Sequence, residues 1–183
     1  MSVETRILLV SGSTRERSTN TAALRTARDM APPGVVAELY GGLSDLPAFS
    51  PDADDDRPHP AVAELRGLLT SAHAVLFCTP EYAGALPGSF KNLLDWTVGT
   101  GELYGKPAAW INAAAPGRGD LAHESLATVL RYVTVDLVAD ACVRIPVGRE
   151  AVDERGEIAD RDVRARIGAV VARVAEHAVA ARA

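Results

Sequence analysis

The chain has few cysteines and few aromatic residues. Among its 183 residues there are two cysteines, and phenylalanine, tryptophan and tyrosine together make up 5%. Cys78 and Cys142 lie in apolar runs and lack the close spacing of metal ligands. We interpret both as reduced structural thiols of a cytoplasmic protein, which excludes a disulfide-stabilised secreted domain and a cysteine-based zinc module.

Long hydrophobic runs and concentrated basic charge are also missing. No apolar run approaches the roughly 20 residues of a membrane-spanning helix, and the first expected strand follows the N-terminus without a signal-peptide pattern. The net charge is −5, and the basic residues, nearly all arginine, are scattered. We therefore expect no membrane and no nucleic-acid partner. The length favours a single domain over residues 1–183.

Apolar patterns predict five strands that alternate with five helices. The strands are apolar runs that suit a sheet buried on both faces, and the helices repeat apolar residues every three or four positions. The expected strands cover residues 7–10, 35–40, 74–78, 106–113 and 136–145. The expected helices cover residues 18–30, 61–70, 87–98, 121–132 and 160–183. This alternation predicts an α/β fold, a doubly wound five-stranded parallel sheet with helices on both faces.

Three loops each follow an expected strand and precede an expected helix. They cover residues 11–20, 79–84 and 113–119, and we refer to them as the first, second and third loops. In doubly wound sheets, ligands bind at the carboxyl ends of the strands, where the strand order reverses. The convergence of three such loops on one ligand is a stronger indication than any single loop.

The first loop is rich in groups that bind anions. Backbone amides and a helix N-terminus would point at one spot. The side chains of Ser13, Ser18, Asn20 and Thr21 can add hydrogen bonds to phosphate oxygens, and Arg15 can add positive charge. The loop has one glycine and no lysine, so it fits neither a Walker A loop nor a dinucleotide fingerprint. One phosphate monoester is plausible, and an ordinary loop whose hydroxyls only cap the helix is the alternative.

The second loop suits a flat heterocycle. Pro80 lacks an N–H group, and the backbone amides of the next few residues, beginning with Glu81, can face ring carbonyls and nitrogens. Tyr82 offers a flat apolar face with a polar tip. Small residues around Gly84 leave room for a planar ring to approach the backbone.

At this point the sequence resembles the NADPH-dependent FMN reductase family, a flavodoxin-like group that includes quinone and chromate reductases. The first motif is Gly12-Ser13-Thr14-Arg15-x-x-Ser18-x-Asn20. The second is Pro80-Glu81-Tyr82-x-x-x-x-Pro87-Gly88-x-x-Lys91-Asn92-x-x-Asp95-Trp96. Both stand in the family's order, at the ends of the first and third expected strands, and the resemblance spans roughly residues 6–146.

The resemblance assigns roles to particular residues. It implies that Ser13, Arg15, Ser18, Asn20 and Thr21 hold the FMN phosphate, and that Pro80, Glu81, Tyr82 and Gly84 line the isoalloxazine ring. The third loop would pass the other edge of the flavin. Two departures stand out: Ala83 replaces an asparagine found in many members, and the third loop lacks their paired glycines.

The chemistry implied is that of a bound flavin. FMN would take a hydride from NADPH or NADH and pass electrons to a small acceptor such as a quinone or a flavin. No histidine, cysteine or serine stands in a catalytic arrangement, and we assign no catalytic side chain. Two alternatives remain: a flavodoxin-type electron carrier, which usually flanks its flavin with aromatics, and a flavin-free phosphate-ligand domain.

Two further segments lead to expectations. The acidic cluster Asp52, Asp54, Asp55 and Asp56 is interpreted as a solvated loop, with no metal site. The expected helix 87–98 carries more apolar residues than one buried stripe needs. Either a neighbouring loop covers the excess, or a second copy does. We expect a homodimer or a dimer of dimers with residues 90–96 in the contact, and Trp96 as a packing residue.

Overall fold

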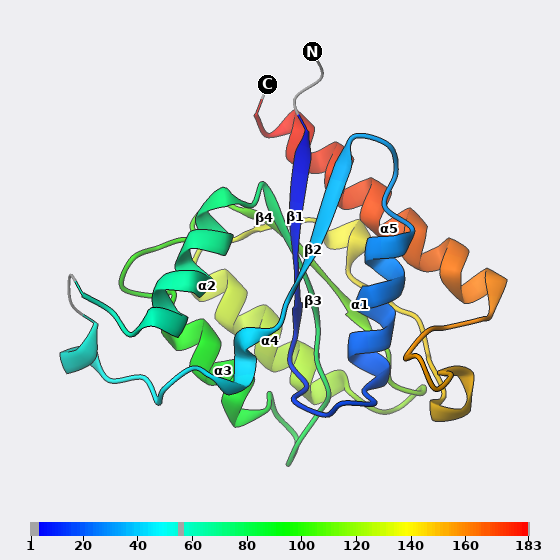
Figure 1. Ribbon diagram of the computed structural model, residues 1–183, viewed down its shortest axis with the longest axis horizontal. Helices are drawn as coiled ribbons and strands as arrows, with labels where there is room; N and C mark the ends of the chain where they lie inside the picture. Colours follow the sequence, from blue (N-terminus) through cyan, green and yellow to red (C-terminus); the bar gives the residue numbers. More distant parts are fainter. Residues whose placement is uncertain (1–3, 55–56, 183) are drawn as a thin grey trace.

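The computed structural model describes residues 4–54 and 57–182, which form a parallel sheet covered by helices on both faces (Figure 1). The strands are β1 (Thr5–Ser11), β2 (Val35–Tyr40), β3 (Ala74–Cys78), β4 (Pro107–Asn112), β5 (Asp136–Leu137) and β6 (Val143–Arg144). Their order is β2-β1-β3-β4-β5, with β6 also pairing with β4, and each of these pairings is parallel. This order confirms the predicted doubly wound α/β architecture.

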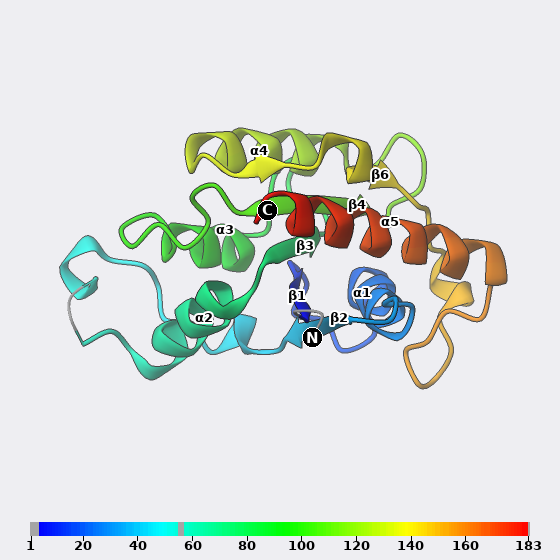
Figure 2. The same cartoon turned by 90° about the horizontal axis from the view of Figure 1, so that it is seen from above.

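The helices divide between the two faces of the sheet (Figure 2). They are α1 (Thr19–Asp29), α2 (Pro60–Ser71), α3 (Gly88–Asp95), α4 (Asp120–Tyr132) and α5 (Arg161–Ala180). Helices α1 and α5 pack on one face, and α2, α3 and α4 pack on the other. Short 3₁₀ turns lie at Gly42–Ser44, Pro51–Ala53, Ala139–Ala141 and Arg149–Ala151.

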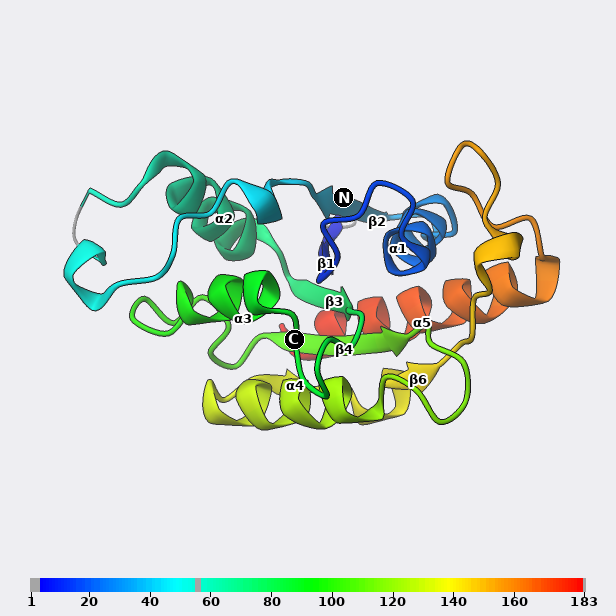
Figure 3. The ribbon, with the colours of Figure 1, turned by 90° about the horizontal axis from the view of Figure 1, so that it is seen from below.

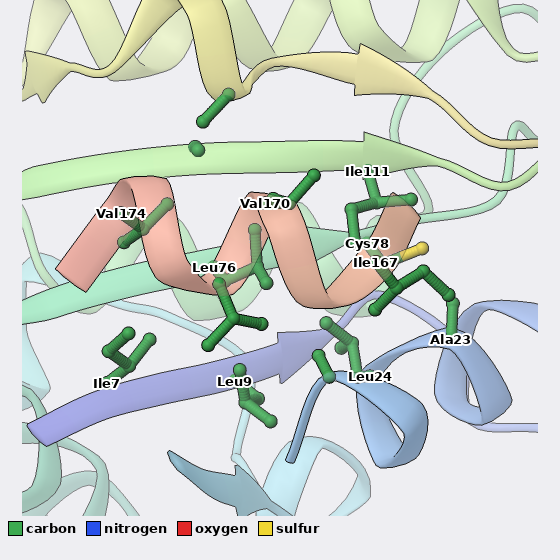
Figure 4. Packing of buried hydrophobic residues seen from close by; sticks show 14 of the residues in the cluster. Ile7, Leu9, Ala23, Leu24, Leu76, Cys78, Ile111, Ile167, Val170 and Val174 are labelled. Carbon is green, nitrogen blue, oxygen red and sulfur yellow. The ribbon is translucent and has the colours of Figure 1, made fainter. Parts of the chain in front are cut away.

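Strand β1 lies between β2 and β3, and burial on both faces explains why its sequence is apolar without alternation. Ile7 and Leu9 face the cluster beneath α1 and α5, whereas Leu8 and Val10 face the cluster beneath the other helices. All four side chains are at most 2% exposed, and burial of each stabilises the fold by about 1.5–3 kcal/mol. Figure 4 shows Ile7 and Leu9 among the residues that pack between the sheet, α1 and α5.

The edge of the sheet differs from the predicted fifth strand over residues 136–145. Strands β5 and β6 have two residues each, and the 3₁₀ turn Ala139–Ala141 separates them. Alanine and aspartate have low strand propensity, and the Asp140 carboxylate turns outward to pair with Arg173 Nε at 2.6 Å. Such an interruption bends an edge strand and shortens the backbone it exposes.

The excess apolar face of α3 is covered by the chain itself. Phe90, Leu93 and Trp96 are at most 1% exposed. Phe49 packs edge-on against Trp96 with ring centroids 5.0 Å apart, and Trp96 Nε1 donates to the Pro47 carbonyl at 2.9 Å. Trp96 is therefore a packing residue, as predicted. These apolar side chains of the 90–96 segment are buried within the chain and are not available for a subunit contact. The excess of apolar residues in this helix therefore no longer supports the expected contact.

The interpretation of the acidic cluster as solvated is wrong for Asp54. Its carboxylate lies 2.6 Å from Arg66 Nη2, and Glu102 Oε1 lies 3.6 Å from Arg66 Nε. The side chains of Asp54, Arg66 and Glu102 are 14%, 10% and 8% exposed, respectively. Arg66 also donates to the Trp96 carbonyl at 2.8 Å. Asp52 is exposed, and Asp55 and Asp56 lie outside the described residues.

The two cysteines are free thiols. Cys78 is buried, and burial raises its pKa to about 12. Cys142 is half-buried, and burial raises its pKa to about 11. The reading of Cys78 as a small buried residue is confirmed, whereas Cys142 caps the 3₁₀ turn at the sheet edge. Within residues 4–54 and 57–182, no helix combines the length and the apolar character needed to cross a membrane.

The Arg66 network leads to a stability prediction. Replacing Arg66 with methionine keeps most of the side-chain volume but leaves two largely buried carboxylates unpaired. We expect the free energy of unfolding to fall by about 3–5 kcal/mol, measured by urea denaturation. The matched control is Arg173→Met, which removes an exposed ion pair and should cost at most about 1 kcal/mol. An equal decrease in the free energy of unfolding in both variants would contradict a buried Arg66 network.

Candidate functional site

The loops after β1, β3 and β4 meet at the carboxyl edge of the sheet (Figure 3). Their residues line one cleft. The cleft has a volume of about 500 Å³, within the range of roughly 300–1,000 Å³ typical of cofactor sites. All predicted site residues except Thr21 and Gly84 line it. The lining consists of Ser13, Arg15, Arg17, Ser18, Thr19, Asn20, Pro80, Glu81, Tyr82, Ala114, Arg118, Gly119 and Arg149.

Gly12 brings the first loop against the second. Its N–H donates to the Cys78 carbonyl at 2.9 Å, which extends the pairing of β1 with β3 by one step. A Cβ atom at residue 12 would lie only 2.6 Å from Cβ of Thr79. The single glycine of this loop is therefore required because the Thr79 side chain occupies the space that a Cβ atom would need.

One end of the cleft is built to bind an anion. Ser18 is the N-cap of α1, and its hydroxyl accepts from the Thr21 amide at 3.4 Å. The amides of Thr19 and Asn20 belong to the first turn, where a helix has no internal acceptors for its N–H groups. These amides and the helix dipole favour a phosphate at this position.

Asn20 and Ser13 add side-chain donors to this end of the cleft. The Asn20 carbonyl oxygen accepts from the Cys78 thiol at 3.3 Å, and the side chain is buried. Its amide nitrogen can therefore donate to a ligand. The Ser13 hydroxyl oxygen accepts from the Arg15 amide at 3.3 Å, which leaves the hydroxyl proton for an acceptor in the cleft.

Thr21 lies behind the lining. Its hydroxyl lies 2.8 Å from that of Ser11, and the Ser11 oxygen also accepts from the Ser13 amide at 3.2 Å. The threonine thus supports the backbone of the first loop. A direct contact between Thr21 and a phosphate, implied by the family resemblance, stays a prediction.

The second loop ends in a tight reversal at its tip. The amides and carbonyls of Tyr82 and Ala85 pair in both directions at 3.1 and 3.0 Å. Ala83 and Gly84 both have positive φ, 50° and 72°, which is the geometry of a type I′ turn. Asparagine followed by glycine is the preferred pair for this turn, so backbone geometry alone favours asparagine at position 83. Gly84 serves the turn and lies outside the cleft lining.

Glu81 links the second loop to α4. Its carboxylate accepts from the Ala122 amide at 3.1 Å, in the first turn of the helix, where a negative charge is favourable. Tyr82 follows with its side chain 49% exposed at the cleft. Pro80, Glu81 and Tyr82 therefore present one backbone strip and one aromatic face to the cleft, while the Glu81 carboxylate supports the fold.

Arg144 holds the third loop from β6. Its guanidinium Nη1 donates to three carbonyls of that loop, those of Ala114 at 3.2 Å, Ala115 at 2.8 Å and Arg118 at 2.7 Å. Its Nη2 pairs with the Asp120 carboxylate. A guanidinium fork is suited to several acceptors at once, so one side chain positions the loop that carries Ala114, Arg118 and Gly119 into the cleft.

A neutral histidine packs beneath the third loop. Burial lowers the pKa of His123, so its ring is neutral near pH 7. Its Nδ1 lies 2.6 Å from the Gly119 carbonyl, which makes Nδ1 the protonated nitrogen. This side chain does not line the cleft, and the absence of a catalytic histidine stays a prediction.

Sequence reasoning missed part of the cleft. Arg17, Thr19, Arg118 and Arg149 line it but were not among the predicted residues. Arg118 lies in a loop that the sequence had already placed near the ligand, so the charge itself was an available signal. Arg149 follows β6, and no local pattern connects that segment with the first loop. Tyr82 is the single aromatic residue among the described cleft residues.

The chain is similar to reductases of known sequence. Residues 5–148 match the model of the family described as NADPH-dependent FMN reductase. An NAD(P)H-dependent FMN reductase of Pseudomonas aeruginosa is 35% identical over 167 residues, which cover 90% of each chain. A 2-hydroxy-1,4-benzoquinone reductase of a Burkholderia species is 30% identical over 163 residues, 87% of this chain and 88% of the relative.

Solved structures show the same fold. The flavoenzyme NAD(P)H:(acceptor) oxidoreductase FerB of Paracoccus denitrificans matches with a TM-score of 0.78 at 27% identity, over 94% of this chain and 98% of that one. A flavodoxin-type, WrbA-like protein of Agrobacterium tumefaciens matches in fold with a TM-score of 0.60 at 14% identity, over 97% and 98%. The flavodoxin-like fold is thus confirmed, and the chain belongs to the NADPH-dependent FMN reductase family.

Proposed function

We propose that this protein is an FMN-dependent NAD(P)H oxidoreductase that passes electrons from a nicotinamide donor through FMN to a quinone, a flavin or a similar small acceptor. The observation that carries the proposal is the cleft itself. It joins an anion-binding helix N-terminus to a backbone strip that suits a planar ring. The described residues that line the cleft offer binding groups and include no nucleophile–base pair, which fits chemistry supplied by a cofactor.

The cleft residues support a proposed placement of FMN. Ser13, Arg15, Ser18 and Asn20 would hold the phosphate at the N-terminus of α1. Pro80, Glu81 and Tyr82 would line the ring, and Thr21 and Gly84 would support the two loops from behind. When bound, FMN would supply hydride acceptance and electron release, and the task of this chain would be to position it.

The relatives support a small acceptor of the quinone type. One is an FMN reductase, another reduces a hydroxylated benzoquinone, and a quinone reductase of Escherichia coli is 31% identical over 110 residues. A flavodoxin-type carrier is less well supported, because the described cleft offers one aromatic side chain, Tyr82. The free thiols agree with our further proposal of a cytoplasmic location.

The first prediction tests this function directly. We expect the purified protein to bind FMN with the flavin absorbance bands and to oxidise NADPH or NADH when a benzoquinone is present. Protein that takes up no flavin would contradict the proposal. Flavin-loaded protein that never oxidises either donor would instead be an electron carrier.

The second prediction concerns the phosphate. Replacing Arg15 with alanine removes a charge-assisted hydrogen bond worth about 1.5–3 kcal/mol. The dissociation constant of FMN should therefore rise roughly ten- to a hundredfold in calorimetric titration. The control is Arg28→Ala, at the other end of α1, which should leave FMN affinity unchanged. An unchanged affinity in Arg15→Ala would remove that residue from the site.

The third prediction concerns assembly. We propose a homodimer or a dimer of dimers, on the family resemblance, with a contact that does not use the buried apolar face of α3. Exposed apolar side chains that could take part are Tyr82, Val98, Tyr104, Leu121 and Tyr132. Light scattering coupled to size exclusion should give a mass at least twice that of the chain. A mass near 19.3 kDa at micromolar concentration would refute the proposal.

A further inference from the structure

Four arginines line the cleft. Arg15 and Arg17 come from the first loop, Arg118 from the third loop, and Arg149 from the 3₁₀ turn after β6. Within residues 4–54 and 57–182, their side chains make no hydrogen bond or ion pair, whereas Arg144 donates to three carbonyls nearby. The whole chain has a net charge of −5, whereas the residues that line the cleft carry more positive than negative charge.

One phosphate monoester does not account for this charge. Such a group carries at most about two negative charges near neutral pH. At the N-terminus of α1 it already meets helix amides, the Ser13 and Ser18 hydroxyls and the two arginines of the first loop. Arg118 and Arg149, both exposed, then remain as two positive charges in the cleft lining that such a phosphate does not neutralise.

Nearby carboxylates do not neutralise these two arginines. Glu81, which also lines the cleft, has its carboxylate on the Ala122 amide. Asp120, two residues after Arg118, pairs with Arg144. Glu150 is exposed next to Arg149, with no ion pair between them. The two guanidinium groups thus keep their donors for a ligand.

The backbones that carry the two arginines are held at the end of β4. The Arg118 carbonyl accepts from Arg144 Nη1 at 2.7 Å. Two residues before Arg149, the Val147 amide donates to the Ala113 carbonyl at 2.9 Å. The backbone at or near both residues is therefore held by hydrogen bonds, and fixed positions of the groups that bind a ligand favour affinity.

We propose that Arg118 and Arg149 form a second anion subsite that binds phosphate groups of the nicotinamide donor. This subsite rests on the proposed function, because it requires a donor that reaches the flavin ring at Pro80–Tyr82. A nicotinamide dinucleotide carries several phosphate oxygens at a distance from its reactive ring, and guanidinium forks match phosphate geometry. The two possible sources are the pyrophosphate, present in both donors, and the 2′-phosphate, present in NADPH alone.

The test uses FMN-loaded protein and two redox-inert probes, adenosine 2′,5′-bisphosphate and adenosine 5′-diphosphate, titrated by calorimetry. The variants are Arg118→Gln and Arg149→Gln. The control is Arg131→Gln, which removes the same charge from an exposed residue in the last turn of α4. We expect each cleft variant to weaken probe binding about tenfold or more and to retain its flavin, and the control to change neither.

The pattern of loss identifies the phosphate. If the variants lose affinity for the 2′,5′-bisphosphate alone, the arginines bind the 2′-phosphate, and we then expect the enzyme to prefer NADPH. If the variants lose affinity for both probes, the arginines bind the 5′-phosphates that both donors share. Unchanged probe affinity in both variants would overturn the proposal, as would loss of FMN from them. Wild-type protein that takes up no FMN would instead count against the proposed function.

Discussion

Parallel pairing of β1, β3 and β4 is the constraint on which the site depends. The register sets Val10 opposite Phe77 and Phe77 opposite Trp110, so the three strands finish close to one line across the sheet. Because every strand of a parallel sheet ends at the same edge, the following loops have to share that edge. The cleft is therefore a consequence of strand order, and its chemistry depends on the loop residues.

Hydrogen bonds between loops convert this shared edge into a defined site. The Gly12 amide ties the first loop to β3, the Glu81 carboxylate ties the second loop to α4, and Arg144 ties the third loop to β6. Each of these groups supports a neighbouring segment as well as its own. Loss of one contact would move a loop relative to the others, and a cofactor site needs its groups in fixed relative positions.

Charge in the cleft is arranged differently from charge elsewhere in the chain. Around the cleft, Arg144 is used for structure, while Arg118 and Arg149 keep their donors. Away from it, Arg66 is largely buried between two carboxylates and fixes the loop that covers α3. Arginine thus stabilises the fold where the protein provides carbonyl or carboxylate acceptors. Where the described residues provide no acceptor, its donors remain for a bound ligand.

The sequence alone determined the features that arise from local patterns. The apolar runs predicted β1, β3 and β4, and the two motifs indicated the family. Helix capping by the loop hydroxyls was the alternative interpretation of the first loop, and Ser18 does cap α1. Only the tertiary structure decided that Arg149 lines the same cleft as the first loop, that Asp54 pairs with Arg66, and that Phe49 packs against Trp96. Periodicity and capping act over a few neighbouring residues, whereas these contacts join segments that are distant in the chain and meet only when the sheet and its helices have packed.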